Sequence, residues 1–234
     1  MNGVLIADKP SGWTSHDVVA TVKKKLGARK VGHLGTLDPL ATGVLPLVIN
    51  RATRFARFLD GGSKVYLATM ELGVETDTYD RDGKVISRRD VAVSEEEILK
   101  VFASFMGRIK QVPPMYSSKK RNGVPLYKLA RKGVVVEREP KEIEIFENTV
   151  TGISLPFVEF RVVCSKGTYI RTICHDAGRL LGCGGILTSL RRLGCGEFSA
   201  SEAITPEATP DALSGRIIPL EEALKRAGAE GVEI

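Results

Sequence analysis

The sequence has few of the patterns that build disulfides or metal sites. Its 234 residues include four cysteines and three histidines. Cys164, Cys174, Cys183 and Cys195 lie too far apart to form a Cys-x-x-Cys pair, and the histidines complete no zinc pattern. We therefore predict free, mostly buried thiols in a reducing, cytoplasmic setting.

Long apolar runs are also missing. No segment approaches the length that crosses a membrane. Met1 is followed by neither the charged region nor the apolar region of a signal peptide. We therefore expect neither a signal peptide nor a membrane partner.

Signatures of cofactor and hydrolase sites are absent as well. Residues 27–33 have the outer spacing of a Walker A loop, but His33 stands where lysine is needed. No G-x-G-x-x-G opens a βαβ unit, and neither H-E-x-x-H nor G-x-S-x-G occurs. Residues 77–83 resemble part of a calcium loop, but Thr78 occupies the first ligand position and Arg89 the closing one. We predict a polar hairpin turn there, and no nucleotide cofactor or metal.

The composition is that of an ordinary globular protein with a basic balance. Apolar residues make up 43% and charged residues 26%. Lys and Arg number 34 against 28 Asp and Glu, which gives a net charge of +6 and a pI near 9.2. This balance favours an anionic partner, of which nucleic acid is the commonest.

Hydrophobic periodicity and turn residues predict helices and strands that do not alternate regularly, which favours a mixed α+β fold over a doubly wound sheet. The most secure helix begins at the capping box Ser94–Glu97 and carries Ile98, Phe102 and Phe105 on one face. The other expected helices are 15–26, 52–58, about 169–181 with Ile170, Ile173, Ala177 and Leu180 inside, and a short one within 217–227. The expected strands are 3–7, 64–73, 157–164 and a pair within 186–198.

Residues 32–47 form the stretch around which the chain is organised. Three glycines permit positive φ angles and two prolines fix φ. Asp38 is the one carboxylate within this stretch of glycines and prolines, and Pro39 pushes the backbone of Asp38 toward an extended conformation. It is either a turn residue or a presented reactive group.

Basic residues recur in two further places. Lys23, Lys24 and Lys25 end the first helix, either as ordinary helix C-terminal charges or as a phosphate-contacting patch. The segment 111–141 combines basic residues with Tyr116 and Tyr127, which suits either RNA contact or a solvated insertion.

Four pieces, taken together in order and spacing, carry a specific resemblance. They are Asp8–His16, the Gly-Thr-Leu-Asp-Pro-Leu-Ala-Thr-Gly core around Asp38, Lys64-Val65-Tyr66, and Ser165–Arg171. This set resembles the TruB-type tRNA pseudouridine synthases, and the resemblance covers about residues 2 to 224. It implies isomerisation of uridine 55 in the tRNA T-loop without a cofactor. It also implies a largely antiparallel central sheet flanked by helices, with an RNA-binding insertion at about 111–141.

The resemblance also assigns residue roles. Asp38 is the catalytic carboxylate, and Arg171 keeps it ionised. Tyr66 stacks on the flipped base near C5, and Tyr169 and Leu190 line the rest of the pocket. His33 contacts the RNA. The expected phosphate contacts are Lys9, Lys119, Lys120, Arg131, Arg191 and Arg192.

Family members usually carry a C-terminal PUA domain, and this chain ends about where that domain begins. We therefore expect a catalytic domain over 1–224 and a tail over 225–234, with a monomer acting on the T-arm of tRNA. Two alternatives remain at this point. One is an RNA-binding or tRNA-folding protein of the same fold, and the other is a synthase acting on another RNA.

Overall fold

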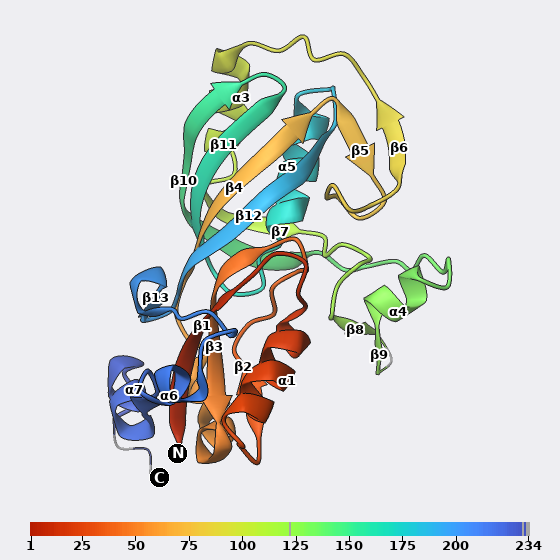
Figure 1. Ribbon diagram of the computed structural model, residues 1–234. Coiled ribbons are helices and arrows are strands. Elements are labelled where there is room, and N and C mark those ends of the chain that lie inside the picture. Colours follow the sequence, from red (N-terminus) through yellow and green to blue (C-terminus); the bar gives the residue numbers. More distant parts are fainter. Residues whose placement is uncertain (122, 231, 233–234) are drawn as a thin grey trace. The chain divides into compact units, whose positions relative to one another are not determined.

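The structure is a computed structural model that describes residues 1–121, 123–230 and 232. The chain forms two compact units, one of residues 1–66 with 190–234 and one of residues 67–189. Two strands, β4 (Lys64–Leu72) and β12 (Gly185–Cys195), run from one unit into the other (Figure 1). The elements make a mixed α+β fold with mostly antiparallel strands, which confirms the predicted fold class.

In the first unit, strand β1 (Gly3–Lys9) lies between two others. It pairs antiparallel with β3 (Thr42–Ile49) along its whole length and with the short β14 (Ile218–Pro219) on its other side. Strand β2 (Val31–His33) pairs antiparallel with β3. β12 joins β3 in parallel, and the remaining strand, β13 (Phe198–Ser199), pairs with β12.

The first helix of this unit begins at a side chain that caps it. Thr14 caps α1 (Ser15–Lys25) and forms a capping box with Asp17. The other helices are η1 (Asn50–Phe55), α2 (Ala56–Leu59), η2 (Ala200–Glu202), α6 (Pro210–Ser214) and α7 (Leu220–Arg226). Apolar side chains of η1, α2 and α7 share one buried core with those of β1 and β3, and this core includes Val4, Ile6, Val44, Val48, Phe55, Leu59, Phe198 and Leu224.

In the second unit the strand order is β12, β4, β11, β10, β7. Residues 155 and 156 connect the long β10 (Lys141–Ser154) to β11 (Phe157–Cys164), and β7 (Gly107–Gln111) pairs with the start of β10. Two small hairpins are separate, β5 (Val74–Thr76) with β6 (Val85–Arg88) and β8 (Lys120–Arg121) with β9 (Val124–Pro125). The helices are α3 (Glu95–Ala103), α4 (Leu126–Ala130) and α5 (Ile170–Leu180).

Several predicted elements are confirmed, and others are corrected. The apolar face of β4 and the inward residues of β11 are buried as expected, and all four cysteines are free and buried. Helix α5 buries Ile170, Ile173 and Ala177 as predicted. Leu180 was wrongly predicted to be buried, since it is 63% exposed in the last turn of this helix.

Strands β2, β3, β7 and β10 were not predicted, and neither were the two-residue strands β8, β9 and β14. β3 lies within residues taken for a loop, because Pro46 breaks its apolar run and a proline usually argues against a paired strand. β10 was not predicted because bulges between Ile145 and Glu147 and between Val150 and Gly152 interrupt the two-residue alternation of its side chains. β2 and β7 are short and half-exposed, so they carry little hydrophobic signal.

Helix α3 provides a direct test of the predicted capping box at Ser94. The Ser94 hydroxyl accepts a hydrogen bond from the Glu97 N–H, and the Glu97 carboxylate accepts one from the Ser94 N–H. We expect Ser94→Ala to lower the free energy of unfolding by about 1 kcal/mol, because it removes the N-cap. Urea unfolding followed by circular dichroism measures the change.

Ser104→Ala, at the other end of the same helix, is the matched control. The Ser104 hydroxyl donates to the Val101 carbonyl at an exposed position, so its loss should change stability by at most about 0.5 kcal/mol. Equal effects from the two variants would contradict the capping assignment.

Candidate active site

Asp38 lies in a loop whose neighbouring side chains are buried. Leu37 and Leu40 are 3% and 5% exposed, whereas Asp38 between them is half-buried. The Asp38 carbonyl accepts a hydrogen bond from the Ala41 N–H at 3.1 Å, which closes a turn. The apolar side chains therefore fix the loop in the core and leave the carboxylate-bearing residue at its surface.

The Ser15 hydroxyl holds the residue before Asp38 by both of its backbone polar groups. It accepts a hydrogen bond from the Leu37 N–H at 2.9 Å and donates one to the Leu37 carbonyl at 3.1 Å. Ser15 is the first residue of α1 and is 3% exposed, so its rotamer is fixed by packing. Sequence reasoning named Ser15 only as a possible helix cap.

The residue after Asp38 is held from the other side. The Pro39 carbonyl accepts hydrogen bonds from the Gly12 N–H at 2.8 Å and from the Lys9 ammonium at 3.1 Å. The Ser11 hydroxyl donates to the Leu40 carbonyl at 3.3 Å. The loop from Lys9 to Ser15 thus binds the backbone on both sides of Asp38.

Lys9 is fully buried, and its ammonium donates to three carbonyl oxygens, those of Pro10, Trp13 and Pro39. Burial lowers the pKa of Lys9 to about 8, and the nearby negative charge of Asp38 acts in the opposite direction. Because all three donors are occupied, no donor is left for the RNA phosphate contact that was predicted. The geometry supports a structural role in the loop instead.

Arg192 is also buried, at 1% exposed. Its Nε donates to the Val44 carbonyl at 2.7 Å and its second terminal nitrogen to the Gly35 carbonyl at 2.9 Å. The geometry therefore does not favour the predicted phosphate contact. Arg191 instead forms a two-armed ion pair with Asp8 at 2.8 and 3.1 Å.

The crossing of β3 and β12 requires glycine at position 43. Gly43 has φ near +100°, and a Cβ added there would lie 2.2 Å from the Arg192 carbonyl oxygen. The parallel pairing of Arg192 with Gly43 places the end of the Asp38 loop against β12. A larger residue at this position would force the two strands apart.

His33 precedes the loop on β2 and is half-buried. Its Nδ1 is buried without a hydrogen-bond partner in the described part of the chain. Burial, followed by the positive charge of Arg192, lowers the pKa of the imidazole below its ordinary value. His33 is therefore neutral at neutral pH.

Tyr66 and Leu190 belong to the first unit and are buried on β4 and β12, at 8% and 6% exposed. The Leu190 carbonyl accepts a hydrogen bond of 3.5 Å from the Thr42 hydroxyl, which follows the Asp38 loop. This hydrogen bond links the Asp38 loop directly to Leu190, one of the predicted pocket residues.

Arg171 belongs to the second unit and is 4% exposed. Its guanidinium donates to the Thr78 carbonyl at 3.0 Å and the Tyr116 carbonyl at 2.9 Å, and it lies 3.3 Å from an Asp80 carboxylate oxygen. Arg171 is therefore a buried residue and not an exposed surface arginine at the start of the helix. These contacts hold the guanidinium in one orientation.

Asp80 is a buried carboxylate that sequence reasoning assigned only to a polar turn. Besides Arg171, it accepts hydrogen bonds from the Thr78 hydroxyl at 2.5 Å and the Asp82 N–H at 3.2 Å. An acidic residue within a turn is ordinary in sequence, so only its 5% exposure reveals the buried ion pair.

The same turn is clamped a second time by α5. His175 lies one helical turn beyond Arg171, and its ring stacks on Tyr79 with centroids 3.9 Å apart and an 8° interplanar angle. Tyr79 has φ near +65°, an unusual conformation for a side-chain-bearing residue. Burial lowers the pKa of His175, so the stacked imidazole is neutral at neutral pH.

Tyr169 is positioned by its backbone. Its N–H donates to the Gln111 side-chain oxygen at 2.8 Å, and its carbonyl accepts from the Gln111 amide nitrogen at 3.1 Å. Gln111 is 3% exposed at the end of β7, a strand the sequence did not predict. Its role was therefore not accessible from sequence.

The basic insertion is organised around β8, β9 and α4. Lys119 is exposed, and its carbonyl accepts a hydrogen bond from the Leu126 N–H. The Arg131 guanidinium lies over the Tyr127 ring at 5.4 Å. An exposed lysine beside an arginine–aromatic pair keeps this segment suitable for RNA contact.

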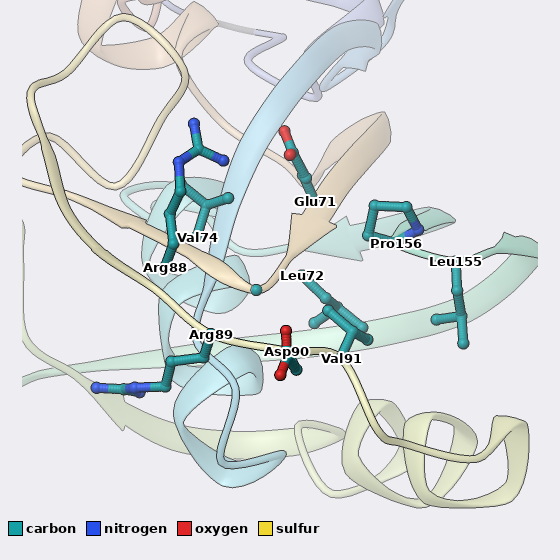
Figure 2. A pocket seen from close by; sticks show the side chains of 10 residues that line it. Glu71, Leu72, Val74, Arg88, Arg89, Asp90, Val91, Leu155 and Pro156 are labelled. Atoms are coloured by element: carbon teal, nitrogen blue, oxygen red, sulfur yellow. The ribbon is translucent and has the colours of Figure 1, made fainter.

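A separate cavity of about 630 Å³ lies in the second unit (Figure 2). Glu71, Asp90, Arg88 and Arg89 line it together with apolar residues of β4, β5 and the turn at Pro156. None of the predicted site residues lines this cavity, so we do not assign the active site to it.

Two features are absent from the part of the chain that the structure describes. No three His, Cys, Asp or Glu side chains there gather into a group suited to a metal ion. No described helix combines membrane-spanning length with sufficient apolar character.

Comparisons with known proteins agree with one another. Residues 23–170 match the TruB family pseudouridylate synthase (N terminal domain), and residues 171–225 match the tRNA pseudouridylate synthase B C-terminal domain. The chain is 47% identical to tRNA pseudouridine synthase B of Clostridium kluyveri, over 96% of this chain and 78% of the relative. It is 51% identical to the Geobacter sulfurreducens protein of the same name, over 88% of this chain and 68% of the relative.

Solved structures show the same relationship. The chain superposes on a structure described as a Cbf5-Nop10-Gar1 complex with a TM-score of 0.74 at 33% identity, covering 96% of this chain and 62% of that one. It also matches an H/ACA RNP bound to a substrate RNA containing 2'-deoxyuridine, with a TM-score of 0.66 at 31% identity, covering 96% of this chain and 58% of that one. Two pseudouridylate synthase family models match adjacent parts of the chain, and relatives of the same family match most of its length. Together with the loop that presents Asp38, these matches show that the chain belongs to the TruB family of tRNA pseudouridine synthases.

Proposed function

We propose that this chain isomerises uridine to pseudouridine at position 55, in the T-loop of tRNA, with Asp38 as the catalytic carboxylate. The observation that carries the proposal is the anchoring of the Asp38 loop. Hydrogen bonds from Ser15 hold the residue before Asp38, and hydrogen bonds from Lys9 and Gly12 hold the residue after it. A carboxylate held on both sides is preorganised for chemistry at a fixed point.

The reaction needs a carboxylate and little else. The N1–C1′ bond of uridine breaks, the base turns, and C5 forms the new bond to C1′. The C5 proton passes to solvent, N1 takes up a proton, and no electrons are gained or lost. Positive charge develops at C1′ as the glycosidic bond breaks, and an ionised carboxylate stabilises or traps it, as in retaining glycosidases.

The remaining residues receive roles by the family resemblance. Tyr66 stacks on the extruded base, and Leu190 contributes to the same apolar surface. From the second unit, we propose that Arg171 keeps the catalytic carboxylate ionised and that Tyr169 lines the pocket. The ion pair with Asp80 and the stack of His175 on Tyr79 hold the turn that Arg171 binds.

Contacts to RNA are proposed for His33 and Lys119. His33, neutral at neutral pH, is suited to a hydrogen bond rather than to charge neutralisation. Lys9 and Arg192 are assigned to loop support, because their donors bind carbonyl groups. We further propose that one chain acts alone, on the T-arm, in the cytoplasm where tRNA is found.

Replacing Asp38 tests the central assignment. We expect Asp38→Asn to reduce tritium release from C5-tritiated uridine in a tRNA transcript roughly a thousandfold or more, because the amide cannot stabilise charge at C1′. Binding of the transcript should remain. Asp211→Asn, an exposed position in the first turn of α6, is the matched control and should retain activity.

Full turnover by Asp38→Asn would contradict the mechanism. Absence of turnover by the wild type, with tRNA still bound, would favour the RNA-binding alternative. Release that persists when the T-loop uridine is replaced would point to another target site.

Ser15 tests the anchoring argument. Ser15→Ala leaves both backbone groups of Leu37 without their partner, so we expect kcat to fall about 10- to 100-fold with little change in KM. Ser15→Thr, which keeps a hydroxyl, should recover part of the loss. Steady-state kinetics well below the unfolding temperature measure both variants.

Ser11→Ala is the matched control for this test, since it removes one hydrogen bond to the same loop from an exposed hydroxyl. A purely structural role for Ser15 would lower thermal stability and leave kcat near the wild-type value.

The imidazole of His33 can be titrated directly. Its burial lowers its pKa, so we expect a midpoint below about 6.5 in an NMR titration of its ring protons. Because the unfolded chain then binds this proton more readily, His33 should lower the free energy of unfolding as the pH falls below about 6.5. His33→Gln assigns the signal, and a midpoint at or above that value would contradict the neutral state.

A further inference from the structure

Positive charge is concentrated in two segments of the chain. Residues 18–59 contain eight basic residues and one acidic residue, Asp38, for a net charge of +7. Residues 111–141 contain eight basic and two acidic residues, for a net charge of +6. This leaves 18 basic and 25 acidic residues elsewhere, a net charge of −7. The insertion is already assigned to RNA, whereas the basic residues of the first segment have no function in the proposal above.

Six exposed basic side chains of the first segment come from three adjacent parts of the first unit, which hydrogen bonds join to one another, and we call them the α1–η1 basic face. Its members come from the last turn of α1, the loop after it and η1, and every one is exposed. They are Lys23, Lys24, Arg29, Lys30, Arg51 and Arg54. Lys25 is excluded, because its ammonium donates to the Glu207 and Ala208 carbonyls.

Asn50 joins the two halves of this face. Its side-chain oxygen accepts hydrogen bonds from the N–H groups of both Arg29 and Lys30, at 3.0 and 3.2 Å, and its own N–H donates to the Lys30 carbonyl at 2.7 Å. Asn50 has φ near +52°, a conformation that asparagine tolerates better than most residues. The loop bearing Arg29 and Lys30 is therefore fixed beside the start of η1, next to Arg51.

The charges of this face are not neutralised within the protein. None of its six side chains forms an ion pair with any residue that the structure describes. Arginines elsewhere on the surface do form such pairs, namely Arg81, Arg89, Arg108, Arg161, Arg191 and Arg226. Like charges gathered without counter-ions cost free energy, which binding of a polyanion recovers.

The face is connected to the catalytic loop by one rigid element. The first residue of α1, Ser15, binds Leu37 beside Asp38, and its last turn carries Lys23 and Lys24. Eleven helical residues span about 16 Å. A molecule bound near Asp38 therefore needs to extend only about that distance to reach the face.

We propose that the α1–η1 basic face binds the phosphate backbone of the RNA substrate outside the nucleotides of the target loop. The proposal rests on the proposed function for the identity of the RNA. No large apolar side chain within residues 18–59 is exposed, which argues against insertion into a lipid surface and against base stacking. The contact is therefore electrostatic and independent of sequence.

Salt-dependent binding tests the proposal without relying on catalysis. We would measure Kd for a tRNA transcript over a series of salt concentrations with two pair variants, Lys24→Gln with Arg29→Gln and Lys30→Gln with Arg54→Gln. Each lost phosphate contact should reduce the slope of log K against log salt by about 0.7 to 0.9. At about 0.15 M salt this corresponds to a roughly four- to fivefold increase in Kd per contact.

Arg216→Gln with Lys225→Gln is the matched control pair. Both positions are exposed in the same unit and lie outside the two basic segments, so Kd and the salt slope should stay at wild-type values. In turnover assays the face variants should raise KM and leave kcat unchanged, because no member of the face touches the reacting atoms.

Salt slopes equal to those of the control pair would overturn the proposal. A fall in kcat at saturating tRNA, with an unchanged Kd, would also overturn it. If the wild type binds tRNA but fails to isomerise it, the proposed function fails, while a reduced slope in the face variants still supports the binding face.

Discussion

The Ser15 hydroxyl is the contact on which the presentation of Asp38 depends. It binds the N–H and the carbonyl of Leu37 at once, so the residue preceding Asp38 has no backbone polar group left unpaired in the core. Lys9 and Gly12 both donate to the Pro39 carbonyl, the one backbone hydrogen-bonding group that a proline has. A loop rich in glycine and proline has many accessible conformations, and these contacts select one of them.

The cost of this arrangement is a buried lysine. Moving an ammonium out of water is unfavourable unless its donors are satisfied, and Lys9 meets this condition with three carbonyl oxygens. Arg192 is also buried, and its guanidinium donates hydrogen bonds to the carbonyls of Gly35 and Val44. Two cations that look like RNA contacts in the sequence therefore serve the interior of the protein.

In the second unit, Arg171 is restrained by comparable means. Two carbonyl groups and the Asp80 carboxylate bind its guanidinium, and the stack of His175 on Tyr79 fixes the turn that supplies one of those carbonyls. Both contacts originate from one face of α5. Arg171 and the ring of His175 are thus placed by a single helix.

Interactions between residues close together in the sequence determined helix starts, strand faces and motif spacing in this protein. The capping box at Ser94, the apolar face of β4 and the spacing of motifs around Asp38 could be read directly, because they depend on neighbours within a few residues. Tertiary structure alone decided that Ser15 binds Leu37, that Asp80 pairs with Arg171, and that Lys9 and Arg192 are buried. These outcomes depend on contacts between residues 22 to 157 positions apart, and a single sequence carries no local signal for such contacts.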